Sequence, residues 1–176
     1  MTKNRLTKIY TKTGDDGTTA LANGSRTAKF TPRIYAIGSI DEASAAIGCI
    51  ENPSSTLDTI QNDLFDMGAE IAGATTVKIT QERIDWLESM IDYYNSHLEP
   101  LHSFVLPKGM HHFARAVVRR AERDLWHWYA TDMDGHAHEK LSQLPLIYLN
   151  RLSDLLFVMA RYHNALNEAL WRPMNG

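Results

Sequence analysis

Cysteine is nearly absent from the sequence, since Cys49 is the only one among 176 residues. A disulfide framework and a cysteine-based metal site within one chain are therefore excluded. Cys49 lies among Ala45, Ala46, Ile47 and Ile50, and these apolar neighbours predict that its thiol is buried.

Long hydrophobic runs and an excess of positive charge are also missing. No stretch approaches the roughly 18 consecutive apolar residues of a membrane span, and no apolar run near residue 1 suits a signal peptide. We therefore expect a soluble, cytoplasmic protein with no membrane contact. The net charge is -3, from 18 basic and 21 acidic residues, so no long-range field attracts nucleic acid. Any phosphate site must be built locally.

Helical periodicity is what the sequence does have. Five helices are predicted, over about 32–50, 55–71, 80–97 and 110–129 and over about 25 residues from Pro145. The hydroxyls of Thr31 and Thr80 are expected to cap the helices that follow them. We read residues 101–109 as an extended connector. The prediction is one all-α domain over 1–176, in which a loop arm over 1–31 precedes a five-helix up-and-down bundle over 32–172.

The arm contains the first segment that suggests chemistry. Residues 10–19 read Tyr-Thr-Lys-Thr-Gly-Asp-Asp-Gly-Thr-Thr, and such a mixture of glycines, hydroxyls and a lysine can wrap backbone amides around phosphate. The Gly-Lys-Ser/Thr order of a Walker A loop is absent, so composition alone leaves an ordinary turn and a nucleotide cradle as alternatives. For Lys29, downstream, residue type alone indicates a solvated charge.

The fourth predicted helix carries a basic face. Arg115, Arg119 and Arg123 recur every four residues, with Glu122 beside them. Because stacked guanidinium groups repel one another, this face needs anions, either carboxylates of a neighbouring helix or subunit or the phosphates of a ligand. Solvated salt bridges are the alternative.

Polar residues also interrupt the apolar fifth helix. Asn150 and Asp154 share a face there, and buried polar groups need partners. We predict a network with the arginine helix, which does not exclude contact with a ligand.

Histidines and aromatic residues suggest two further readings. Eight histidines favour a metalloprotein by their number alone, but their spacings match neither His-Glu-x-x-His nor paired Glu-x-x-His motifs, so we place them at surfaces and helix ends. The cluster Trp126, Trp128 and Tyr129 indicates core or subunit contact rather than a cofactor site.

Four segments in the same order resemble the PduO-type ATP:cob(I)alamin adenosyltransferases. They are residues 10–19, Arg33…Ala36…Gly38…Asp41-Glu42, Arg119-Arg120-Ala121-Glu122-Arg123 and Asn150-Arg151-Leu152-Ser153-Asp154. Together they span nearly the whole chain. The resemblance implies a homotrimer of five-helix bundles with active sites between adjacent subunits. It also implies transfer of the 5′-deoxyadenosyl group from ATP, carrying Mg²⁺, to cob(I)alamin, which gives adenosylcobalamin and triphosphate.

The resemblance implies roles for individual residues as well. The ATP phosphates would be held by Thr11, Lys12, Thr13, Gly14, Thr18, Thr19 and Lys29. The other subunit would complete the nucleotide site with Arg119, Glu122, Arg123 and Asn150. Asp41 and Arg115 would form an intersubunit salt bridge. Phe104 would pack where the lower axial ligand of the corrinoid sits and, with Arg119 and Asn150, serve catalysis. A cobalamin reductase and an adenosylcobalamin-dependent enzyme are the implied protein partners.

One departure from the family pattern concerns the corrinoid side. The segment between Pro107 and Arg115 is about five residues shorter than is typical, which is more than one helical turn. The shortening favours an alternative, a non-catalytic trimeric relative that binds nucleotide or adenosylcobalamin. Without the resemblance, Phe104 would be expected in the core.

Overall fold

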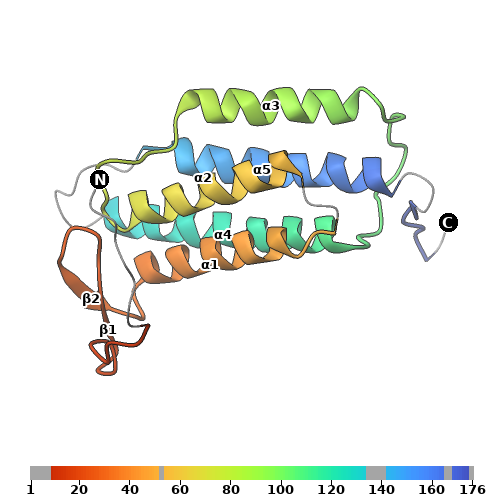
Figure 1. The fold of residues 1–176 in the computed structure, drawn as a ribbon. Coiled ribbons are helices and arrows are strands. Elements are labelled where there is room, and N and C mark those ends of the chain that lie inside the picture. Colours follow the sequence, from red (N-terminus) through yellow and green to blue (C-terminus); the bar gives the residue numbers. More distant parts are fainter. Residues whose placement is uncertain (1–8, 52–53, 134–141, 165–167, 175–176) are drawn as a thin grey trace.

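The computed structural model describes residues 9–51, 54–133, 142–164 and 168–174. Within these ranges it contains a small hairpin followed by five helices, as Figure 1 shows. The elements are β1 (Thr18–Ala20), β2 (Arg26–Ala28), α1 (Pro32–Gly48), α2 (Ser55–Ile71), α3 (Gln81–Asn95), α4 (Met110–Met133) and α5 (Leu144–His163). The predicted helical bundle is therefore confirmed, and the order of its helices is as expected.

The helix ends follow from local chemistry, although two predicted caps are wrong. Ser54 caps α2, because its hydroxyl accepts a hydrogen bond from the Leu57 amide at 3.3 Å. Thr31 and Thr80 do not cap in this way. The Thr31 hydroxyl donates to the Ala28 carbonyl at 3.1 Å, and the Thr80 hydroxyl donates to Glu82 at 3.0 Å. Proline at the first turn of α1 still favours the start of that helix.

Helices α1 and α4 are antiparallel neighbours. As the α1 number rises the α4 number falls along three contacts: Arg33 with the Trp128 ring, Ser39 with Asp124, and Glu42 with Arg120. This register fixes which residues of the two helices lie at the same height. It also separates the two ends of the bundle, with the hairpin at the start of α1 and the connector before α4 at the other end (Figure 1).

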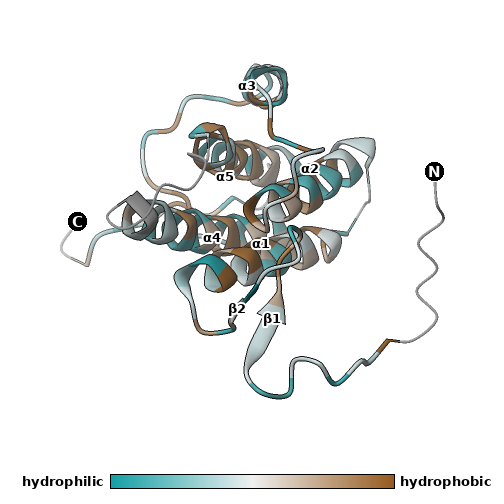
Figure 2. Ribbon diagram, turned by 90° about the vertical axis from the view of Figure 1, so that its left-hand side faces the viewer, coloured by the Kyte–Doolittle hydropathy of each residue, from teal (hydrophilic) through white to brown (hydrophobic). Residues whose placement is uncertain are grey.

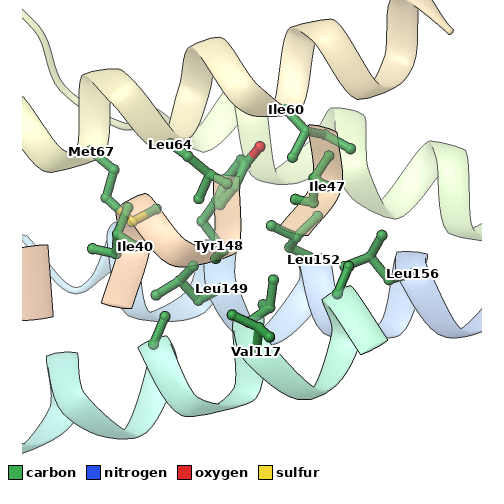
Figure 3. Close-up of a cluster of buried hydrophobic side chains, with 14 of the residues drawn as sticks. Ile40, Ile47, Ile60, Leu64, Met67, Val117, Tyr148, Leu149, Leu152 and Leu156 are labelled. Atoms are coloured by element: carbon green, nitrogen blue, oxygen red, sulfur yellow. The ribbon is translucent and has the colours of Figure 1, made fainter. Parts of the chain in front are cut away.

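The core lies between α1, α2, α4 and α5. Close to its centre are Ile40, Ile47, Ile60, Leu64, Met67, Val117, Tyr148, Leu149, Leu152 and Leu156 (Figure 3). Helix α3 packs mainly on α5 and buries only Ile84 and Leu87 fully, so in Figure 2 it stands outside the other four. A partly buried ion pair joins α3 to the bundle, because Arg83 donates to Asp63 of α2, which also accepts from the Tyr148 hydroxyl at 2.7 Å.

Three further details differ from the sequence-based expectations. The arm is not all loop, since β1 and β2 form an antiparallel hairpin. Cys49 is exposed rather than buried, because it is the C-terminal cap of α1 and faces away from the core. Helix α5 has 20 residues against the expected 25, and α4 continues to Met133. Within the described residues no helix combines the length and the apolar character needed to cross a bilayer.

Candidate nucleotide and corrinoid site

The arm forms a tight loop before β1. Lys12 has a φ of 60° and Gly17 has a φ of 81°, and this left-handed backbone lets the chain reverse twice within a few residues. The hydroxyls of Thr11 and Thr13 lie 2.9 Å apart. Both threonines and Lys12 are exposed, so the loop presents hydroxyls and an ammonium to solvent on a preformed backbone.

Lys29 is held against this loop. Its ammonium donates to the Gly14 carbonyl at 2.7 Å, and its backbone amide donates to the Gly17 carbonyl at 2.9 Å. A Cβ at Gly14 would lie 3.1 Å from the Lys29 Nζ and 3.0 Å from the Thr18 carbonyl oxygen. A side chain at position 14 would crowd this ammonium and the Thr18 carbonyl, so glycine favours their close approach, and Lys29 is not merely a solvated charge.

Arg26 of β2 contacts this loop, and sequence reasoning missed it. Its guanidinium donates to the Thr18 hydroxyl and to the Thr13 carbonyl, and it lies 3.6 Å from an oxygen of Asp16. Asp16 in turn accepts from the amide and the hydroxyl of Thr18, at 3.0 and 2.7 Å. These two hydrogen bonds, with the charge of Arg26, hold the pKa of Asp16 below its usual value. Only pairing of β1 with β2 could have revealed Arg26, and no strand was expected.

The arginine face of α4 is present, and its members have different surroundings. Arg119 and Arg123 are exposed, and Arg123 donates back to the Arg119 carbonyl at 3.0 Å. Arg115 is half-buried, with its guanidinium 5.3 Å from the centre of the Phe157 ring. Burial, with repulsion from Arg119, lowers the pKa of Arg115. Among the described residues, neither Arg119 nor Arg123 forms an ion pair with an acidic side chain.

Asn150 links α5 to this face, as predicted. Its side-chain amide donates to Glu122 at 3.2 Å, and its carbonyl oxygen accepts from Arg151 at 2.9 Å. Arg151 also donates to Glu88 of α3 at 2.7 Å. Glu122 is therefore held beside Arg119 and Arg123 by a polar chain that runs across three helices.

The arm and the arginine face lie apart within one chain. The register of α1 and α4 places Arg119 level with Ala43, about eleven residues or roughly 16 Å along α1 from Pro32, where the arm ends and the helix begins. By the same register Asp41 and Arg115 are offset by about six residues, or roughly 9 Å. Their predicted salt bridge therefore does not form within the chain.

Phe104 lies at the opposite end of the bundle from the arm. It is 79% exposed, so the expectation of a core phenylalanine is wrong. Its ring packs edge-on against Trp171, with 6.2 Å between the centroids. The two residues are far apart in the sequence and meet because an antiparallel bridge joins Val105 to Leu170. Sequence reasoning missed Trp171, and no local pattern points to it.

The other histidine and aromatic predictions have mixed outcomes. Within the described residues no three histidine, cysteine or acidic side chains gather as metal ligands. His111 of α4 stacks on His163 of α5 at 5.0 Å, and burial, with repulsion from His163, lowers the pKa of His111 to about 4. Trp128 is buried, and the Arg33 guanidinium lies over its ring, 5.4 Å from the centroid, whereas Trp126 is exposed. His136 and His138 lie outside the described residues.

Comparison with known proteins gives consistent results. The profile of the family described as "Cobalamin adenosyltransferase" matches residues 9–163. A protein named corrinoid adenosyltransferase from Mycobacterium tuberculosis is 46% identical, over 96% of this chain and 94% of its own length. A corrinoid adenosyltransferase from Bacillus subtilis is 38% identical, over 90% of this chain and 87% of its own length.

Solved structures extend the similarity to the fold. A Lactobacillus reuteri PduO-type ATP:corrinoid adenosyltransferase, a phenylalanine-to-alanine variant complexed with cobalamin and ATP, is 33% identical with a TM-score of 0.78, and the match covers 94% of this chain and 100% of that one. An arginine-to-lysine variant of the Lactobacillus reuteri protein, complexed with ATP, is 34% identical with a TM-score of 0.79. That match covers 93% of this chain and 100% of the variant.

Proposed function

The chain belongs to the cobalamin adenosyltransferase family, and from this premise we propose how its residues transfer the 5′-deoxyadenosyl group of ATP to cob(I)alamin. The reaction gives adenosylcobalamin and triphosphate. Cob(I)alamin is itself the nucleophile, so a cobalt–carbon bond forms to C5′ as the bond from C5′ to the triphosphate oxygen breaks. The two electrons of the new bond come from cobalt, and the leaving triphosphate keeps the pair of the broken bond. No protein nucleophile is needed.

The nucleotide half of the site consists of the arm and the arginine face. Lys12 lies on a preformed loop and the Lys29 ammonium is held against it, and Thr11 and Thr13 of the loop and Thr18 and Thr19 of β1 add hydroxyls. Arg119 and Arg123 are exposed guanidinium groups without an ion-pair partner among the described residues. Phosphate oxygens match both sets, because charge-assisted hydrogen bonds to phosphate stabilise the charge that grows on the departing triphosphate.

The two sets meet, in our proposal, between subunits of a homotrimer. The observation that carries this step is the register of α1 and α4, which keeps arm and arginine face apart in one chain. The arm of one subunit would close on the Arg119 face of the next. Asp41 of one subunit would likewise pair with Arg115 of its neighbour, which would add a second carboxylate to that of Asp154, whose charge already acts on this half-buried arginine within the chain.

Mg²⁺ would be carried by ATP. Phosphate oxygens are ligands that Mg²⁺ prefers, and together with the lysines and arginines the ion would spread the triphosphate charge. Among the described residues there is no cluster of three acidic or histidine side chains to hold it separately.

The corrinoid half lies around Phe104. We propose that its exposed ring packs against the lower face of the corrinoid and keeps a fifth ligand away from cobalt(II), which favours reduction to cobalt(I). The shortened connector still presents Phe104 at the surface, so the feature that favoured a non-catalytic relative does not bury the ring. A reductase would deliver the electron in the cytoplasm, and an adenosylcobalamin-dependent enzyme would take the product.

An anaerobic assay tests the activity. Reduced cobalamin and Mg-ATP are mixed with the protein, and loss of the cob(I)alamin spectrum is followed together with formation of the light-sensitive cobalt–carbon product. We expect turnover. ATP binding without turnover would instead support the non-catalytic alternative.

Mixed trimers test the division between subunits. Lys29→Ala and Arg119→Ala damage different halves of the proposed site, so each variant alone should be nearly inactive. When the two are co-expressed, about a quarter of the sites in randomly mixed trimers combine an intact arm with an intact arginine face. Partial recovery of activity is expected, and no recovery would place both halves in one chain. Arg115→Ala should weaken the trimer itself, as measured by sedimentation.

A further inference from the structure

Phe104 is held by the C-terminal segment rather than by the core. The Trp171 amide donates to the Phe104 carbonyl at 2.7 Å, and the Leu106 amide donates to the Ala169 carbonyl at 2.8 Å. The Ser103 hydroxyl adds a bond to the Trp171 carbonyl at 3.0 Å. Because the Phe104 side chain is mostly exposed, this ladder and the Trp171 ring fix where it points.

The C-terminal segment is itself fixed by one buried arginine. The Arg161 side chain, at the end of α5, is only 8% exposed, and its Nε donates to Glu168 at 2.9 Å. Its Nη2 donates to the carbonyl of Glu99 at 2.9 Å. Glu99 lies two residues before the connector, and Glu168 begins the described part of the C-terminal segment. Arg161 therefore binds both the chain just before the connector and the start of the described C-terminal segment.

This arrangement suits positioning better than stability. A buried ion pair gains little net free energy, because the cost of removing both charges from water offsets their attraction. What it does give is geometry, since a planar guanidinium with two fixed acceptors holds both segments in one relative position. The ladder between the connector and the C-terminal segment is short. Without Arg161, its few backbone hydrogen bonds would have to offset the conformational entropy lost when both segments become ordered.

We infer that Arg161 and Glu168 are positioning residues for the corrinoid half of the site, acting through the C-terminal segment and Trp171 to hold Phe104 against the lower face of the corrinoid. The inference rests on the proposed role of Phe104. Neither residue touches substrate. Their loss should therefore affect corrinoid binding and the geometry of cobalt(II), and leave intact the nucleotide half, because within the described residues neither of them contacts the arm or the arginine face.

Glu168→Gln tests the inference, with the full-length protein and three readouts. We expect the KM for cobalamin to rise about tenfold while the KM for ATP stays within about twofold. The spectroscopic signature of four-coordinate cob(II)alamin in the presence of ATP should diminish. Glu168→Asp, which keeps the charge, should restore part of that signature. An unchanged cobalamin KM together with a full signature in Glu168→Gln would overturn the inference.

Asp63→Asn is the matched control. It removes one charge from another largely buried arginine–carboxylate pair, Asp63 with Arg83, which holds α2 to α3 away from the connector. It should lower the melting temperature without changing the cobalamin KM. If it shifts that KM as much as Glu168→Gln does, the effect is general loosening of the fold and the inference is wrong.

Two further variants separate this inference from the proposed function. Phe104→Ala should abolish the four-coordinate signature, and the Glu168→Gln change should add nothing in that background. If Phe104→Ala keeps the signature, the proposed role of Phe104 fails. If Phe104→Ala loses the signature while Glu168→Gln keeps it, only the inference about Arg161 and Glu168 fails. Trp171→Ala changes an exposed side chain, so it replaces Glu168→Gln as the test variant if Glu168→Gln does not fold. It should reproduce the higher cobalamin KM, and a wild-type value would contradict the inference.

Discussion

The nucleotide half and the corrinoid half of the proposed site are built in different ways. The arm loop is held by side chains that are close in sequence: Lys29 and Arg26 contact a loop that begins about fifteen residues earlier. Phe104 depends on a segment 67 residues further along, through a ladder and a buried ion pair. Local contacts therefore preform the loop that we propose binds phosphate, whereas the proposed corrinoid wall depends on long-range contacts and should shift when a distant residue changes.

The largest difference between the halves should follow from Arg119→Ala. This change removes a guanidinium from the charge on the departing triphosphate, and such losses cost about 10²- to 10³-fold in rate. The trimer should stay intact. The neighbouring Arg120→Ala, which breaks only the pair with Glu42, is the control in steady-state assays. Unchanged turnover in Arg119→Ala would mean that the triphosphate lies elsewhere.

A smaller effect, confined to the other half, is expected from Phe104→Ala. Because the reduction of cobalt(II) would lose the help of the ring, turnover that starts from cob(II)alamin should fall about tenfold or more. Turnover that starts from chemically reduced cob(I)alamin should fall less. Phe65→Ala removes another exposed ring, 68% exposed against 79% for Phe104, from α2 and should change neither rate. Equal losses with both cobalt states would contradict a role in reduction.

Arg26→Ala sharpens the comparison within the nucleotide half. Loss of the bonds to Thr13 and Thr18 should loosen the loop and raise the KM for ATP about tenfold, with the cobalamin KM unchanged. Ser25→Ala, in the turn of the same hairpin, is the control in the same titration. An ATP KM that stays at the wild-type value would show that the loop keeps its shape without Arg26.

The smallest expected effect is a loss of stability at low pH, which depends on His111 near the connector before α4. His111 has a pKa of about 4 in the folded chain and an ordinary value of 6.5, so between these values the unfolded chain binds the additional proton. The free energy of unfolding should therefore fall as the pH drops from 6.5 towards 4, by at most about 3 kcal/mol and by less with solvent screening. Denaturant unfolding of His111→Gln should show a flatter pH profile. A slope equal to that of the wild type would assign the effect to other groups.

Much of the fold was predictable because helical periodicity is a local property. The range of α2 was predicted to the residue, and α1 to within about two residues, since apolar spacing and proline mark them directly. Burial was less predictable: Cys49 has apolar neighbours in sequence, yet the helix ends there and the thiol faces solvent. The threonine caps were wrong because each hydroxyl found another partner, a choice that depends on rotamer rather than on residue type.

The sequence by itself determined the helices of the bundle and the residues that we propose bind phosphate, because helical periodicity and short motifs depend on residues close together in the chain. Only the tertiary structure decided that Phe104 meets Trp171, that Arg161 ties their two segments together, and that the arm and Arg119 stand apart in one chain. These relations depend on helix register and on contacts between distant segments. A one-dimensional pattern carries no information on either until packing of the core fixes the heights of the helices.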